Sequence, residues 1–353
     1  MFSPAGKVAL TRAGEIARVK SVPVLLVAAL LGALAGCGGG TVTETSRTTT
    51  AGTSGTSVGT SSQRGGPGQG SSASAGTPAG VESVRAVAAK PPSKIPLVSA
   101  PGHTGPKWKV VAAIASQPAA WIAERSGVTL MRFDQSLVRL ALHAGSAEPG
   151  GGGWRYGSEI GPHEVHRVVA GFNGGFRLSY GSVGFMADGR APVPLSVGLG
   201  SIVIYEDGAT DVGAWQEGVP AHGRAIESVL QDLRLLVDHG TAAATVETCA
   251  IECWGSTLGG GVAVARSALG VREDGQLVWA AGESVSPAAI AQALIGAGAQ
   301  RAVELDINPE WVAGYLYLHH GGPIAVPVVP GQTGIPGQLL APYSRDFFTV
   351  LAR

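Results

Sequence analysis

Residues 38–80 constrain the fold more than any other stretch of this 353-residue chain. They consist almost entirely of Gly, Ser and Thr, contain no aromatic residue and carry only three charged side chains. Such a composition cannot bury enough apolar surface to offset the entropy lost on folding. We expect a flexible tether with a root-mean-square reach of roughly 35 Å. After a proline-rich, extended lead-in over residues 81–107, the folded part is expected to cover residues 108–353, a length typical of one large domain.

The N-terminus has the charge and hydropathy pattern of an export signal. Four basic residues precede an apolar run from Val22 to Gly36, which is too short for a comfortable transmembrane helix. Residues 34–37 resemble the lipobox of bacterial lipoproteins, whose cysteine becomes the lipidated first residue. The resemblance implies a signal peptide over residues 1–36 and a lipid anchor on Cys37 that holds the protein to the outer face of the bacterial cell membrane. Ordinary signal cleavage, which would release a soluble secreted protein, is the alternative.

Charge and cysteine content exclude several classes of protein. The chain has 25 Lys and Arg against 25 Asp and Glu, and no stretch supplies the clustered surplus of cations that nucleic-acid binding needs. Three cysteines are too few for a disulfide scaffold. Outside the cytoplasm Cys249 and Cys253 are expected to form one small disulfide, worth at most about 2 kcal/mol. A metal or redox pair lacks histidine partners at a useful spacing.

The folded region reads as many short strands with few helices. Asp-Gly dipeptides at residues 207–208 and 274–275 mark hairpins. One helix has clear start and stop signals: it is expected to begin after Ser286, a typical N-cap followed by proline, and to end at Gly298. A shorter helix is expected over residues 162–169. Strands are expected at residues 128–134, 137–142, 201–206, 210–215, 268–272, 276–280 and 301–306. Since no βαβ alternation is present, we predict an α+β fold of strand-rich mixed sheets, with functional side chains at the strand ends.

Three segments together resemble the phosphodiester glycosidase family in order and spacing. They are the Phe-Asn-Gly-Gly-Phe sequence of residues 172–176, the Ala-Arg-Ser-Ala-Leu-Gly sequence of residues 265–270 with its Asp-Gly turn, and the passage from the Ser286 helix to the Leu-Asp pair at residues 305–306. The resemblance implies a single domain that hydrolyses the bond between a sugar's anomeric carbon and a phosphodiester oxygen in a glycan of the cell envelope.

The turn after Asp306 departs from the family pattern. Most members continue with Gly-Gly-Gly-Ser, whereas here Ile-Asn-Pro-Glu-Trp follows. Glycines let a backbone turn present its N–H groups to an anion, and proline removes one such donor. The same anion-binding turn therefore cannot form here. The chain is therefore interpreted either as a divergent branch with another substrate or as a non-catalytic surface lipoprotein that binds glycan or phosphate through a degenerate site.

Arg266 and two carboxylates are the main candidates for chemistry. The resemblance implies that the planar guanidinium of Arg266 contacts phosphate; the alternative is a structural ion pair with Glu304 or Asp306. These two carboxylates are two residues apart on an expected strand, which puts them on one face, and a glycosidase needs a carboxylic acid and a carboxylate. Asp306 is the first choice for acid–base catalysis, and Glu304 is the second.

Further candidates lie before and after these strands. Asn173 is expected either to bind sugar or phosphate through its amide or to act as a turn residue, and Gly174 and Gly175 allow a tight bend. Glu310 is a third carboxylate candidate, and Trp311 is a possible surface for stacking on a sugar. A near-neutral pKa on Glu304 or Asp306 in an open cleft would favour an enzyme, whereas a cleft filled by Trp311 and Pro309 would favour a binding module. No cofactor is predicted, and calcium is left open.

Overall fold

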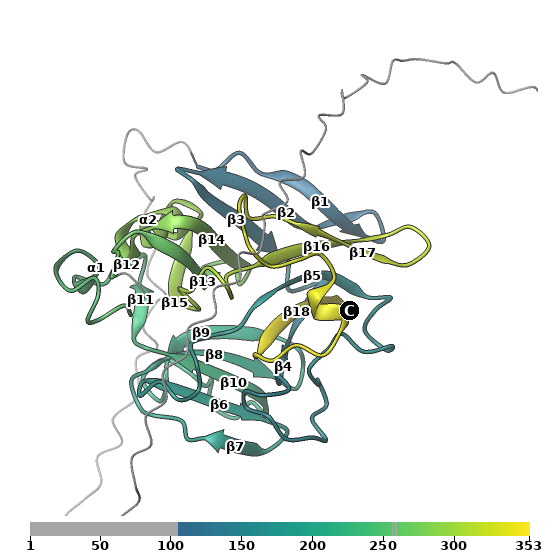
Figure 1. Ribbon diagram of the computed structural model, residues 1–353, viewed down its shortest axis with the longest axis horizontal. Coiled ribbons are helices and arrows are strands. Elements are labelled where there is room, and N and C mark those ends of the chain that lie inside the picture. Colours follow the sequence, from purple (N-terminus) through teal and green to yellow (C-terminus); the bar gives the residue numbers. More distant parts are fainter. Residues whose placement is uncertain (1–104, 256, 258–259) are drawn as a thin grey trace, which may run out of the picture. The chain divides into compact units, whose positions relative to one another are not determined.

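The computed structural model describes residues 105–255, 257 and 260–353 (Figure 1). The predicted signal peptide, the lipidation site Cys37, the tether and residues 81–104 of the lead-in lie outside the described residues. No helix within the described ranges is long and apolar enough to cross a membrane.

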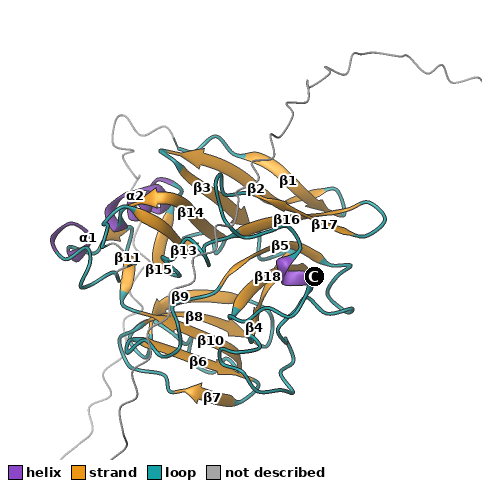
Figure 2. Cartoon of the chain, in the orientation of Figure 1, coloured by secondary structure: helices purple, strands orange, loops and turns teal. Residues whose placement is uncertain are grey.

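Three antiparallel sheets make up the fold, with little helix (Figures 1 and 2). The largest has the order β1 (Lys109–Ile114), β2 (Gln117–Arg125), β3 (Val128–Phe133), β14 (Leu277–Val285), β13 (Val264–Arg272), β15 (Ala299–Glu304), β11 (Leu235–Asp238) and β12 (Thr241–Ala242). The second has the order β7 (Arg190–Val193), β6 (Val183–Ala187), β10 (Ile226–Asp232), β8 (Gly200–Tyr205) and β9 (Thr210–Ala214). The third has the order β17 (Pro323–Pro327), β16 (Gly314–His319), β5 (Val168–Asn173), β18 (Phe347–Ala352) and β4 (Val138–His143).

The helical content is two α-helices and one 3-10 turn in the described part of the chain: α1 (Thr245–Thr248), α2 (Pro287–Gly296) and η1 (Gln338–Leu340). The strand-rich α+β class is confirmed. All ladders described between the named strands are antiparallel, so the mixed parallel and antiparallel pairing that was predicted is not found in these sheets.

Local sequence signals located part of the fold: the expected strands correspond to β3, β4, β8, β9, β13, β14 and β15, and the other described strands were not predicted. The Ser286 side chain accepts a hydrogen bond from the Ala289 N–H at 3.2 Å, which caps α2 as predicted. The helix expected over residues 162–169 is wrong, because residues 162–167 form turns and β5 begins at Val168. There the Glu164 carboxylate folds back to accept a hydrogen bond from the Gly161 N–H at 3.0 Å, which closes a turn.

An aromatic cluster joins the largest sheet to the third one. Phe172 on β5 stacks on Trp279 of β14 at 5.3 Å between ring centroids and on Phe133 of β3 at 6.4 Å. Phe348 on β18 lies 5.6 Å from the same ring. Because all four side chains are fully buried, they hold β5 and β18 against β3 and β14.

Candidate functional site

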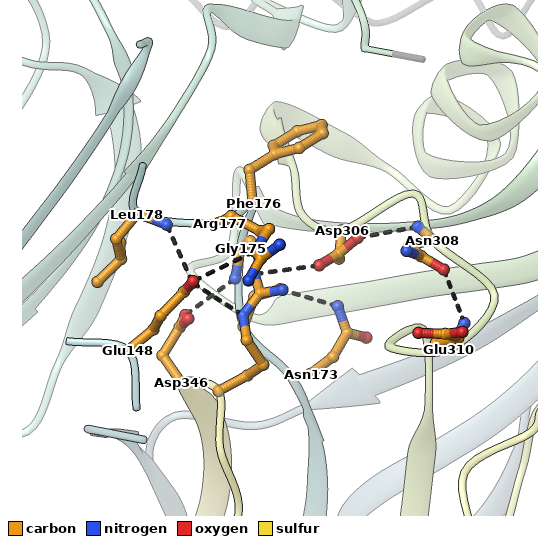
Figure 3. Close-up of polar contacts among 12 residues, drawn as sticks. Glu148, Asn173, Gly175, Phe176, Arg177, Leu178, Asp306, Asn308, Glu310 and Asp346 are labelled. Atoms are coloured by element: carbon orange, nitrogen blue, oxygen red, sulfur yellow. Dashed lines mark hydrogen bonds and ion pairs between the residues drawn. The ribbon is translucent and has the colours of Figure 1, made fainter. Parts of the chain in front are cut away.

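A cavity of about 360 Å³ lies where the ends of β5, β15 and β18 come together (Figure 3). Phe347 pairs with Asn173 in the β18–β5 ladder, so the residues before β18 run beside those after β5. β15 pairs with β13 and delivers the residues after Glu304 to the same place. The lining residues are Phe176, Arg177, Ser179, Tyr180, Thr257, Asp306, Ile307, Asn308, Trp311 and Arg345.

Asp306 is the sequence candidate that reaches this cavity with a carboxylate. The Ser267 N–H donates to the Asp306 carbonyl at 3.0 Å, while the Ser267 carbonyl accepts from the Leu305 N–H at 2.8 Å. Two residues thus oppose one, as in a β-bulge, and a bulge re-aims the side chains that follow it. Glu304 is therefore buried away from the cavity, whereas Asp306 lines it.

The Asp306 carboxyl is held by the Arg345 guanidinium and by backbone N–H groups. Its Oδ2 accepts from Arg345 Nη2 at 3.3 Å, and its Oδ1 accepts from the Asn308 N–H at 2.9 Å. Burial raises the pKa of Asp306 to about 6, although the Arg345 guanidinium opposes the rise. A carboxyl with this pKa exists in both protonation states near neutral pH, which suits acid–base chemistry.

Arg345 is the functional candidate that sequence reasoning missed. Its Nη2 also donates to the Gly175 carbonyl at 2.8 Å, and its guanidinium lies 5.2 Å from the centre of the Trp311 ring. Its Nη1 is buried and has no hydrogen-bond partner among the described residues. Because the Arg345 guanidinium belongs to the lining, this wall of the cavity is suited to an anionic oxygen. The signal in the sequence is weak: an Arg-Asp pair directly before the apolar strand β18.

Arg266 and Glu304 form a fully buried ion pair outside the cavity lining. The remaining donors of the guanidinium face the carbonyls of Val285 at 3.1 Å, Trp254 at 3.0 Å and Val262 at 3.4 Å. Burial raises the pKa of Glu304 to about 7, against the lowering effect of Arg266. The structure thus shows Arg266 in the structural ion pair with Glu304, which was the alternative to a phosphate contact, and not in the cavity lining.

Asn173 and the two glycines after it shape the floor beside the cavity. The Asn173 amide donates to the Gly174 carbonyl and to Ser267 Oγ, both at 2.8 Å, and accepts from the Ala313 N–H at 3.3 Å. Since the amide is buried and its groups are engaged, the structure places it in a bracing position rather than on the cavity wall.

Gly174 and Gly175 let two buried carboxylates approach the backbone. A Cβ on Gly174 would lie 1.9 Å from Asp346 Oδ2, and one on Gly175 would lie 1.9 Å from Asp232 Oδ2. Asp346 accepts from the Gly175 N–H at 3.0 Å, and Asp232 accepts from the Phe176 N–H at 3.1 Å. Burial raises the pKa of Asp346 to about 7 and that of Asp232 well above its usual value. Sequence analysis missed both, because nothing local distinguishes a buried Asp at a strand end from a solvated one.

Aromatic rings form the apolar part of the cavity wall. Phe176 and Tyr180 stack at 5.4 Å between centroids, and Trp311 lines the same cavity from the turn after Asp306. The cavity is open, and Pro309 is not among its lining residues. Glu310 is exposed and lies outside the cavity lining. Its backbone N–H donates a hydrogen bond to Asn308 Oδ1 at 3.0 Å.

The predicted disulfide between Cys249 and Cys253 is confirmed. It follows α1 and precedes Trp254, whose side chain is buried and cannot stack on a sugar. In the part of the chain that the structure describes, no group of three or more His, Cys, Asp or Glu side chains is placed to hold a metal ion.

Comparison with known proteins gives likeness of fold only. A scan against protein-family models and a search of curated proteins each found no match. Among solved structures, the chain is similar to the catalytic domain of zebrafish N-acetylglucosamine-1-phosphodiester alpha-N-acetylglucosaminidase, auto-inhibited by its pro-peptide, with a TM-score of 0.41 and 14% identity over 71% of this chain and 89% of that chain. It is also similar to a hypothetical protein from Synechocystis, with a TM-score of 0.36 and 14% identity over 70% of this chain and 64% of that chain. Neither likeness bears on the activity of this chain.

Proposed function

We propose that this protein is a hydrolase that cleaves a sugar-1-phosphodiester in a glycan of the cell envelope. It acts outside the cytoplasm, anchored through Cys37 to the outer face of the bacterial cell membrane. The observation that carries the proposal is one juxtaposition: the side chains of Asp306 and Arg345 line one cavity with the rings of Trp311, Phe176 and Tyr180.

Each part of this arrangement matches one part of such a substrate. Aromatic faces pack against the apolar face of a sugar ring. The Arg345 guanidinium neutralises a phosphodiester oxygen and stabilises the charge that grows on it as the bond to the anomeric carbon breaks. Water supplies a hydroxyl to that carbon, and Asp306 accepts the water proton as general base. The products are a free sugar and a phosphomonoester, so the added water accounts for all atoms.

The test is hydrolysis of a panel of sugar-1-phosphodiesters by the full chain. Asp306→Asn is expected to lower kcat by about 10²- to 10⁴-fold, the range for loss of a general base. Arg345→Met is expected to raise KM as well as to lower kcat. Glu310→Gln is the matched control, because this carboxylate lies four residues after Asp306 and outside the cavity lining. Full turnover by Asp306→Asn would refute the assignment.

The pH dependence adds an independent check. With Asp306 as base, kcat/KM is expected to rise through pH about 6, the pKa of this group. Because the positive charge of Arg345 lowers that pKa, Arg345→Met should move the inflection to higher pH. No turnover on any substrate, together with saturable glycan binding that Arg345→Met weakens, would instead identify a binding module.

A further inference from the structure

Glu148 forms ion pairs with both Arg177 and Arg345, the arginines that line the cavity, although Glu148 is not itself a lining residue (Figure 3). Its Oε1 lies 3.2 Å from Arg177 Nε, and its Oε2 lies 3.2 Å from Arg345 Nε. The same Oε2 accepts a hydrogen bond from the Leu178 N–H at 3.1 Å. One carboxylate therefore restrains two cations and the segment that carries one of them.

The backbone around Glu148 is tied to the segment before Arg345. The N–H groups of Ala147 and Glu148 both donate to the Ser344 carbonyl, at 3.1 Å and 3.0 Å. A Cβ on Gly145 would lie 2.4 Å from the Arg345 carbonyl carbon, so only glycine permits this approach. Glu148 and Arg345 are consequently presented from two adjoining pieces of backbone, which fixes the separation of the ion pair.

The need for such a restraint follows from charge and exposure. The Arg345 side chain is 5% exposed, whereas that of Arg177 is 71% exposed and has solvent to move into. Two guanidinium groups that line one cavity repel each other, and a flexible arginine loses conformational entropy when it is held in place. The Glu148 side chain is 18% exposed, so its interaction with both cations is only partly screened by water.

We propose that Glu148 is a positioning residue that holds Arg345 and Arg177 as a two-arginine pair for an anionic group of the substrate. The inference rests on the proposed function, since it specifies which side chains receive the phosphodiester. Two guanidinium groups can contact two oxygens of one phosphate, which a single partly engaged arginine cannot do.

If Glu148 positions the arginines, its neutralisation should change the affinity for an anion in the direction opposite to that expected from charge alone. Removal of a negative charge near an anion site should by itself strengthen anion binding. If Glu148 aligns the pair, its neutralisation should weaken binding instead, because the arginines lose their preorganised geometry. The direction of the change therefore separates the two effects.

The experiment is calorimetric titration of the full chain with inorganic phosphate at low salt. Glu148→Gln, which keeps an acceptor for the Leu178 N–H, is expected to weaken phosphate binding by about tenfold. Glu148→Asp keeps the charge but withdraws it by one methylene, and it is also expected to weaken binding. Glu227→Gln is the matched control, because Glu227 likewise joins two arginines, Arg139 and Arg155, outside this cavity.

Thermal melts establish that each variant is folded, and Glu148→Asp decides the question where Glu148→Gln does not fold. Unchanged or tighter phosphate binding by a folded Glu148 variant would overturn the inference, as would the absence of saturable phosphate binding by the unmodified chain. Failure of the proposed function looks different: phosphate still binds in a Glu148-dependent way, but no sugar-1-phosphodiester is hydrolysed.

Discussion

The buried Arg266–Glu304 pair permits a stability prediction whose size depends on pH. Arg266→Met leaves the Glu304 carboxyl in a fully buried position without its cation. Burial already raises the pKa of Glu304 to about 7 beside Arg266, and loss of the cation should raise it further, so between pH 7 and pH 9 the variant loses about 1.4 kcal/mol per pH unit that the wild type does not lose. At pH 5 the carboxyl is protonated in both folded proteins, and this difference vanishes. The destabilisation by Arg266→Met should therefore shrink on acidification.

The partner substitution should behave differently. Glu304→Leu leaves a guanidinium that cannot lose its proton, and loss of one partner of a buried pair costs about 3–5 kcal/mol at both pH 5 and pH 9. The double variant Arg266→Met/Glu304→Leu replaces the pair by apolar groups and should lose less stability than either single variant, because no uncompensated charge is left.

Urea denaturation, followed by tryptophan fluorescence at pH 5 and at pH 9, measures the free energy of unfolding of the wild type, the two single variants and the double variant. A loss in Arg266→Met that is the same at both pH values would contradict the protonation argument, and losses that simply add in the double variant would contradict the pairing. If Arg266→Met were as stable as the wild type but no longer bound phosphate, the result would support the phosphate contact that the sequence resemblance implied for Arg266.

Three other measurements test separate features. Gly175→Ala should strongly reduce the free energy of unfolding, because its Cβ would lie 1.9 Å from a buried carboxylate oxygen, whereas Gly181→Ala meets nothing within 4 Å and should be tolerated; equal melting temperatures would refute this. Since the folded state binds more protons than the unfolded state between the unfolded pKa of Asp346 and its raised folded value of about 7, the stability from this group is present at acidic pH and is lost as pH rises through that value. Asp346→Asn should therefore flatten the fall in denaturation midpoint from about pH 5 to about pH 8, and an unchanged slope would contradict the burial argument. Replacement of Cys249 and Cys253 by serine should cost at most about 2 kcal/mol of unfolding free energy, measured with and without reductant; a larger loss would show that the bridge does more than restrict a short loop.

Part of the fold could be predicted from local signals, because a tight hairpin turn and a helix cap are encoded within a few residues. The Asp-Gly turns at residues 207–208 and 274–275 lie between paired strands, β8–β9 and β13–β14, as hairpin chemistry requires. The helix α2 begins at its proline after a serine cap. The helix expected over residues 162–169 is wrong, since residues 162–167 form turns and β5 begins at Val168.

The candidate site could be predicted only in part, because its members come from three strand ends far apart in the sequence. Alternation along a strand put Glu304 and Asp306 on one face, but the bulge opposite Ser267 separated them. Arg345 and Glu148 each look like ordinary charged residues in their own segments. Their positions beside the cavity arise from the register of β18 on β5 and from the contact of two loops, which no local pattern reveals.

The sequence by itself determined the α+β class, the strand-rich pattern, the capped helix and the disulfide partners. These features depend on side-chain periodicity, turn chemistry and short-range geometry, all of which act within a few residues. Tertiary structure alone decided which charges are buried as pairs and which face the cavity. Burial, and with it the pKa of a carboxyl and the availability of a guanidinium, depends on strand register between distant segments, and the Arg266–Glu304 pair and the Asp306–Arg345 contact show the two outcomes.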